Sequence, residues 1–164
     1  MPSITPFLWF DSDLAEPIAF YRSVFPDRAV HGEPITTDAP DSTMPSSGED
    51  GPISTATIEL CGQRIMLLNG GPAHAGFSES ISLFVSVETQ SELDELWGRL
   101  VSGGGEESRC GWLKDRYGLS WQVVPTMLGT VLGSADRARA QQALDAMLQM
   151  NKLDIATLQS AFDR

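Results

Sequence analysis

Basic residues are scarce in this chain, and their scarcity excludes two classes of function. There are 11 Lys and Arg residues against 22 Asp and Glu residues among 164, which gives a formal net charge of −11. Nucleic-acid binding depends on basic side chains that displace counterions from phosphates, and anionic lipid surfaces attract the same side chains. We therefore expect neither a nucleic acid nor a membrane among the partners.

Histidine, cysteine and long apolar runs are also rare. The 2 histidines and 2 cysteines exclude a metal site built from several histidines and a disulfide framework. No apolar run approaches the roughly 18 residues that a membrane helix needs, and the segment Met1–Pro6 lacks the basic region of a signal peptide. These features predict a cytoplasmic protein with reduced cysteines, of about one domain in length.

The order of the predicted elements occurs twice: strand, helix and about three strands over residues 4–69, and again over 81–124. In the first half the pattern predicts a strand at 4–10, a helix ending before Pro26, and strands at 28–35, 53–60 and 64–69. In the second half it predicts a strand at 81–87, a helix from the capping-box sequence at 89–92 to the glycines at 103–105, and strands at 107–110, 112–116 and 119–124. This repetition predicts an α+β fold of two βαβββ modules.

The remaining segments are a polar loop and a helical tail. Residues 36–52 are rich in Asp, Ser, Pro and Gly, and a role over a binding site and a loop without function both fit them. Beyond Pro125 the composition predicts helices at 127–132, 135–150 and from Asp154 onward. Their Met and Leu side chains are typical of core or of a dimer contact, so we expect a homodimer.

Several segments together resemble a known family. They are Ile4–Asp11, Phe20–Pro26, Leu68–Pro72 and, most specifically, Cys110–Pro125. They are similar to the PhnB-like family, often described as 3-demethylubiquinone-9 3-methyltransferase, within the vicinal oxygen chelate superfamily. That superfamily also includes glyoxalase I, bleomycin-resistance proteins and extradiol dioxygenases.

The resemblance implies a domain organisation. It implies one vicinal-oxygen-chelate domain over residues 1–164, in which the modules at 4–72 and 80–125 pair and curl their sheets around a cavity. A helical tail over 126–164 completes it.

The resemblance also implies where a metal would bind. Enzymes of the superfamily hold a divalent ion with about four His, Glu or Gln side chains, and the corresponding positions here are near Pro6, Leu67, Ser82 and Gln122. Only Gln122 is a good ligand and Ser82 is a weak one, while Asn69, two residues past Leu67, could replace that leucine. Such neutral ligands hold a divalent ion poorly, so we expect no bound metal.

The methyltransferase description requires a cofactor site that the sequence lacks. A dinucleotide-type fold places a glycine-rich turn directly after its first strand and opens a helix with it. Here Asp11–Asp13 follows the first strand, Gly103–Gly105 ends a helix, and Gly70–Gly71 leads into Pro72. We therefore expect no adenosylmethionine site and no other cofactor.

Three functional hypotheses remain. The first is a module that binds a small molecule in an apolar cavity, lined by Trp9 and Trp121 with Asn69, Ser82 and Gln122 as polar anchors. The second is a lyase, isomerase or dioxygenase-like enzyme with an atypical or absent metal. The third is a dimer whose cavity is filled by its own side chains, since both tryptophans fit a core as well as a pocket.

Other reactive side chains have two interpretations each. His31 and His74 fit solvated loops, although His74 could also stand at a cavity mouth. Cys110 fits a buried inert thiol or a reactive one, and Glu59 fits a surface carboxylate or a base. The charged run Lys114–Arg116 predicts a solvated hairpin with local ion pairs.

Overall fold

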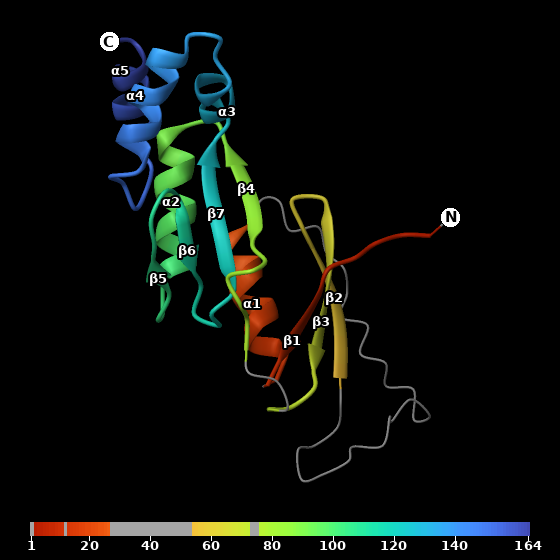
Figure 1. Ribbon diagram of the computed structural model, residues 1–164. Helices are drawn as coiled ribbons and strands as arrows, with labels where there is room; N and C mark the ends of the chain where they lie inside the picture. Colours follow the sequence, from red (N-terminus) through yellow and green to blue (C-terminus); the bar gives the residue numbers. More distant parts are fainter. Residues whose placement is uncertain (1, 12, 27–53, 73–75) are drawn as a thin grey trace. The chain divides into compact units, whose positions relative to one another are not determined.

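The computed structural model describes residues 2–11, 13–26, 54–72 and 76–164, which form two compact units (Figure 1). The first unit is Met1–Gly76 and the second is Phe77–Arg164. The described part of the first unit contains a three-stranded sheet, and the second contains a four-stranded sheet followed by helices. The predicted α+β class and the helical C-terminal part are therefore confirmed.

The first unit contains four described elements. They are β1 (Phe7–Phe10), α1 (Ala15–Val24), β2 (Ser54–Leu60) and β3 (Gln63–Asn69). The sheet order is β1-β3-β2, with β1 parallel and β2 antiparallel to β3. The predicted strand at 28–35, the loop at 36–52, His31 and His74 lie outside the described residues.

Alternation along these strands forms the core of the first unit. Leu8 of β1 is in register with Leu67 of β3, and both are buried. Helix α1 packs on β2, and its predicted apolar stripe of Ile18, Tyr21 and Val24 is buried as well. Successive residues of a strand point to opposite faces of the sheet. The residues next in sequence to these buried ones therefore lie on the opposite face of the first sheet.

The second unit has a complete βαβββ order, as the sequence predicts. Its elements are β4 (Leu83–Val87), α2 (Gln90–Val101), β5 (Glu106–Glu107), β6 (Trp112–Lys114) and β7 (Ser120–Pro125). The sheet order is β4-β7-β6-β5, with β4 parallel to β7 and the other pairs antiparallel. The strand predicted at 107–110 ends at Glu107, because Cys110 (φ 59°) and Gly111 (φ 84°) have left-handed backbone that turns the chain into β6.

Helix α2 begins and packs as its sequence predicts. The Thr89 side chain accepts from the backbone N–H of Glu92, and the Glu92 carboxylate accepts from that of Thr89, which is a capping box. Leu93, Trp97 and Leu100 are buried on one side of the helix, which packs on β4, β6 and β7. One face of the second sheet is therefore covered by α2.

The chain ends in three helices that pack on one another. They are α3 (Met127–Leu132), α4 (Arg137–Met147) and α5 (Ile155–Phe162). The helix predicted at 135–150 is shorter, because Asp136 caps its first turn by accepting from the N–H of Arg139 and the chain leaves the helix at Leu148. Within the described residues, no helix has the length and apolarity needed to span a membrane.

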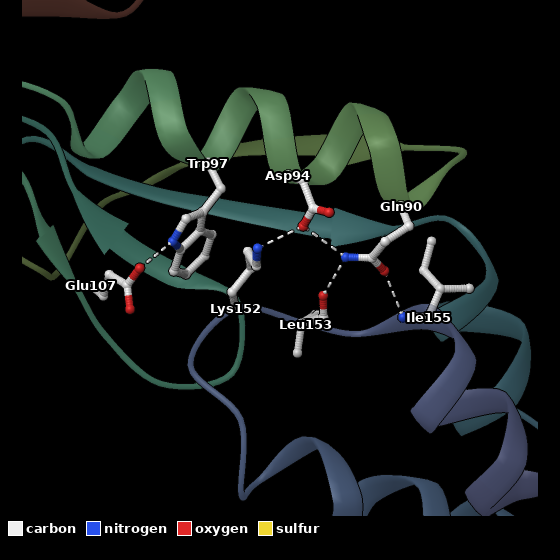
Figure 2. Close-up of polar contacts among 7 residues, drawn as sticks. All are labelled: Gln90, Asp94, Trp97, Glu107, Lys152, Leu153 and Ile155. Atoms are coloured by element: carbon white, nitrogen blue, oxygen red, sulfur yellow. Dashed lines mark hydrogen bonds and ion pairs between the residues drawn. The ribbon is translucent and has the colours of Figure 1, made fainter.

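Side chains of α2 hold the segment between α4 and α5 (Figure 2). The Gln90 amide donates to the carbonyl of Leu153 at 3.2 Å and accepts from the backbone N–H of Ile155 at 2.8 Å. Lys152 Nζ lies 2.7 Å from Asp94 Oδ1, and hydrogen bonds from Lys152 and Gln90 hold the pKa of Asp94 below its usual value. Leu153 is fully buried between these contacts. The last two helices are thereby anchored to the second module.

The same segment fixes the turn before β6. The backbone N–H of Cys110 donates to the carbonyl of Met150, and that of Gly111 donates to the carbonyl of Asn151, both at 2.8 Å. The N–H of Val123 in β7 in turn donates to the carbonyl of Gly111. The helical tail therefore positions the residues at the start of β6.

Candidate functional site

The face of the second sheet opposite α2 carries a row of aromatic and polar side chains. Gln122 of β7 is in register with Phe84 of β4 on one side and with Trp112 of β6 on the other. Phe84 is 58% exposed, and Trp112 and Gln122 are half-buried. We call this surface the Gln122 face and define it by Ser82, Phe84, Trp112, Lys114, Ser120 and Gln122. A large exposed apolar ring beside amide and hydroxyl groups suits contact with an organic molecule.

Two of the predicted site residues meet on this face. The Gln122 amide Nε2 donates to Ser82 Oγ at 2.8 Å, although the two residues are 40 positions apart in the sequence. This bond fixes the orientation of the amide and directs its Oε1 away from Ser82. The pair therefore presents an acceptor of fixed direction between the rings of Phe84 and Trp112, with the Ser82 hydroxyl beside it.

A cavity of ≈ 360 Å³ lies at the Lys114 end of the same face. Its lining consists of Glu79, Ser108, Arg109, Cys110, Trp112, Leu113, Lys114 and Ser120. Lys114 and Ser120 are directly opposite each other on β6 and β7. The cavity volume suits a small organic ligand, since sites for such molecules begin at about 300 Å³.

Ser120 is the unusual residue of this cavity. It is 1% exposed, and among the residues that the structure describes its Oγ has no hydrogen-bond partner. A buried hydroxyl without a partner costs free energy and calls for an explanation. A group supplied by a ligand is one that would satisfy it.

An ion pair lies beside this hydroxyl. Lys114 Nζ is 2.7 Å from Glu79 Oε1, which raises the pKa of Lys114 and lowers the pKa of Glu79. Glu106 of β5 is opposite Lys114 in register, and Arg109 adds a second cation to the lining. Because the Glu79 side chain is 72% exposed, solvent weakens its hold on the ammonium.

Trp121 occupies the core, which is one of the two roles that the sequence left open. It is 2% exposed, and its Nε1 donates to Asp115 Oδ2 at 2.9 Å. Trp121 alternates with Gln122 along β7, so its ring lies on the α2 side of the sheet. Asp115 is itself buried, with 2% exposed, so the expected solvated hairpin at Lys114–Arg116 is wrong at its central residue. That carboxylate accepts hydrogen bonds from within its own turn and from Trp121.

Trp9 and Asn69 both lie in the first unit and hold one turn. Trp9 Nε1 donates to the carbonyl of Gly71 at 2.9 Å, and the N–H of Gly71 donates to Asn69 Oδ1 at 3.3 Å. The Trp9 ring lies directly against Gly70, where a Cβ would overlap it. These side chains therefore stabilise the turn after β3, and their role as ligand anchors stays a prediction.

The residues at the implied metal positions do not fit a divalent ion. Leu67 is fully buried in the core of the first unit, and the carbonyl of Pro6 accepts from the N–H of Met66. Ser82 and Gln122 bond to each other, and neither carries charge. In the described part of the chain, no group of three or more His, Cys, Asp or Glu side chains could hold a metal. The donor set is therefore too small and too neutral for the superfamily's ion.

Comparison with known proteins places the chain in a family. The sequence model of the family described as 3-demethylubiquinone-9 3-methyltransferase matches residues 2–124. The chain belongs to this family. A search of curated proteins finds no match.

Solved structures show the same fold. A protein from Bacillus cereus, described as a putative 3-demethylubiquinone-9 3-methyltransferase and PhnB protein, is 28% identical with a TM-score of 0.58, over 76% of this chain and 100% of that chain. PA1353 from Pseudomonas aeruginosa is 21% identical with a TM-score of 0.57, over 76% and 98%. The fosfomycin resistance protein FosX from Listeria monocytogenes is 15% identical with a TM-score of 0.54, over 80% and 96%. The predicted membership of the family described as 3-demethylubiquinone-9 3-methyltransferase is confirmed, and the predicted fold is shared with these structures.

The chain does not fit the cofactor that the family's description suggests. The described residues contain two mixed sheets and no doubly wound parallel sheet. Between β1 and α1 the sequence has no glycine, and the N–H of Ala15 at the start of α1 donates to Asp13 Oδ1. A phosphate- or carboxylate-binding turn of the dinucleotide type is therefore missing at its usual place.

The sequence pattern alone did not single out Glu79, Trp112, Lys114 and Ser120, which line the candidate site. A signal for three of them was present, because alternation from Gln122 places Ser120 on the same face and the hairpin brings Lys114 and Trp112 beside them. No local signal marked Glu79, which reaches Lys114 from the segment before β4.

Proposed function

We propose that this protein binds a small organic molecule on the Gln122 face of its second module. The observation that carries the proposal is the row of Phe84, Gln122 and Trp112, in register across three strands, on the sheet face that α2 leaves uncovered. The row continues into the cavity lined by Trp112, Lys114 and Ser120. Aromatic surface with a few fixed polar groups is typical of ligand sites.

Each part of the row would contribute a different interaction. The rings of Phe84 and Trp112 offer faces on which an aromatic or apolar group can stack. The Gln122 carbonyl, held by the bond from its amide to Ser82, offers an acceptor of fixed direction. This division supports a ligand that has an apolar body and at least one hydrogen-bond donor.

A panel of uncharged fragments tests this function. Benzamide, phenol and benzyl alcohol are titrated into the isotope-labelled protein, and backbone amide shifts are followed by NMR. We expect at least one fragment to give saturable shifts centred on Phe84, Trp112 and Gln122. Gln122→Ala should weaken that fragment about tenfold, because it removes one directed hydrogen bond.

The control for this experiment is Gln141→Ala. Gln141 is exposed on α4 and donates to Asp145 at 2.8 Å, so the same substitution there should leave fragment affinity unchanged. Shifts that do not saturate for any fragment, or that saturate only on the tail helices, would contradict the proposed function.

We also propose that two copies of the chain associate. The support is apolar surface on the second unit outside the Gln122 face, where Leu148 is 47% exposed and Ile81 62%. Covering such side chains on a second copy is a common way to remove them from water.

The expected mass in light scattering is twice the 17.8 kDa of the chain. Leu148→Glu should shift the mass toward the monomer, because it places a charge where a dimer would bury a leucine. The matched control is Gln149→Glu on the neighbouring exposed position. A monomer mass that is constant over a hundredfold range of concentration would refute the dimer.

A further inference from the structure

The cavity beside Lys114 is lined by two groups that can donate hydrogen bonds to an anion, a hydroxyl and an ammonium. Ser120 Oγ is buried and, within the described residues, has no partner, and the Lys114 side chain lies opposite it on the adjacent strand. Cross-strand neighbours have Cβ atoms about 5 Å apart, so the two side chains start from adjacent positions in the cavity lining. An ammonium and a hydroxyl together donate hydrogen bonds and supply positive charge.

The present partner of Lys114 indicates the chemistry that fits there. Glu79 places a carboxylate oxygen 2.7 Å from Lys114 Nζ, yet Ser120 Oγ stays unpaired while that contact exists. A carboxylate from a ligand inside the cavity would reach both donors, whereas Glu79 reaches only one. Because the Glu79 side chain is 72% exposed, it can turn into solvent when it is displaced.

The walls of the cavity add selectivity for the rest of such a ligand. Trp112 and Leu113 provide apolar surface, and Arg109 provides a second cation. Met150 and Asn151 hold the backbone N–H groups of Cys110 and Gly111, so the wall next to Arg109 is fixed by the tail. The lining holds two cations, Lys114 and Arg109, against one carboxylate, Glu79, and Glu106 lies opposite Lys114 on β5. Displacement of Glu79 by a ligand would leave the two cations facing the cavity, which favours an anionic ligand.

We propose that this cavity binds the carboxylate of a small aromatic acid, with Lys114 Nζ and Ser120 Oγ as its donors and Glu79 as the group that it displaces. The proposal rests on the proposed function, because Trp112 belongs to both the Gln122 face and the cavity. It adds the class of ligand and a direction for it, with the acid group at Lys114 and the ring at Trp112.

The test compares benzoate with benzamide, which differ in charge and have nearly the same shape. Both are titrated at constant ionic strength while the amide signals of Ser108, Lys114 and Ser120 are followed by NMR. We expect benzoate to saturate these shifts and to bind at least about tenfold more tightly than benzamide, as a charge-assisted hydrogen bond requires. Equal affinity would overturn the carboxylate site.

Three variants separate the roles of the side chains. Lys114→Gln and Ser120→Ala should each weaken benzoate about tenfold, and Glu79→Gln should strengthen it severalfold because the competing carboxylate is lost. Ser120→Ala should leave the melting temperature unchanged or higher, since it removes an unpaired buried hydroxyl. A lower melting temperature for Ser120→Ala, with benzoate affinity unchanged, would show that the hydroxyl serves the fold alone and would overturn the proposal.

Controls distinguish a failure of the carboxylate site from a failure of ligand binding on the Gln122 face. Arg139→Gln removes an exposed cation on α4 and should not alter benzoate affinity. If uncharged fragments bind the Gln122 face and benzoate gains nothing over benzamide, only the carboxylate site fails. If neither benzoate nor any uncharged fragment saturates, both fail. Tighter binding of phenyl phosphate than of benzoate would assign the cavity to a phosphoryl group and would overturn the choice of a carboxylate.

Discussion

Asp115→Ala is expected to destabilise the second unit by about 4 kcal/mol, because it leaves several hydrogen-bond donors inside the protein without an acceptor. Asp115 Oδ1 accepts from the backbone N–H groups of Tyr117 and Leu119 at 2.9 and 3.1 Å, and Oδ2 accepts from the indole of Trp121 at 2.9 Å. Alanine keeps none of these acceptors, while the donors stay inside the protein. Urea unfolding followed by tryptophan fluorescence measures the loss.

Two further variants make this result interpretable. Asp115→Asn retains one carboxamide oxygen and should lose about half as much free energy. Asp145→Ala removes an exposed carboxylate that accepts from Gln141 on the surface of α4, and it should change stability by less than about 0.5 kcal/mol. A loss below about 1 kcal/mol for Asp115→Ala would show that the turn holds without its carboxylate.

Gly111→Ala should lower the free energy of unfolding by about 3 kcal/mol, the second largest effect, because backbone strain and steric overlap add together. Gly111 has a φ of 84°, and a Cβ there would lie 2.9 Å from the carbonyl oxygen of Val123 and 3.1 Å from Leu153 Cδ1. The carbonyl belongs to β7 and cannot retreat without breaking the sheet. The substitution should therefore loosen the junction between β6, β7 and the tail.

Gly118→Ala is the matched control for this effect. Its φ of 83° is nearly the same, but nothing lies within 4 Å of the added Cβ. Gly118→Ala should therefore lose only about 1 kcal/mol of stability, which is the cost of placing an alanine in left-handed backbone. Hydrogen exchange of the α5 amides should rise in Gly111→Ala and stay near wild type in Gly118→Ala. Equal losses in the two variants would contradict a steric role for the contact with Leu153.

The sequence predicted those features that depend on near neighbours. Thr89 and Glu92 form the expected capping box because its atoms lie within one helical turn. The strand predicted at 119–124 is observed as β7 over 120–125. The capping box and this strand depend on residues close together in the chain. Ser82 and Gln122 were both named as candidate site residues, but their bond, across 40 positions, depends on the parallel pairing of β4 with β7.

The features that escaped prediction depend on register and on distant segments. The sequence left a core and a pocket equally open for Trp121, and the alternation of β7 decides between them by turning the ring toward α2, where Asp115 accepts from it. Gln90 and Leu153 meet although they are 63 positions apart. Glu79 pairs with Lys114 from outside any regular element. Nothing in the composition of these segments specifies such contacts, because they arise only when the whole sheet has formed.

Intermolecular NOEs between a bound fragment and the protein give the most direct evidence for or against a ligand on the Gln122 face of the second module. The measurement uses the tightest-binding uncharged fragment and the protein with its aromatic residues labelled. We expect NOEs from the fragment to the rings of Phe84 and Trp112, which flank Gln122 in register, and none to Trp121 in the core. NOEs only to the tail, for example to exposed Leu148, would contradict this expectation.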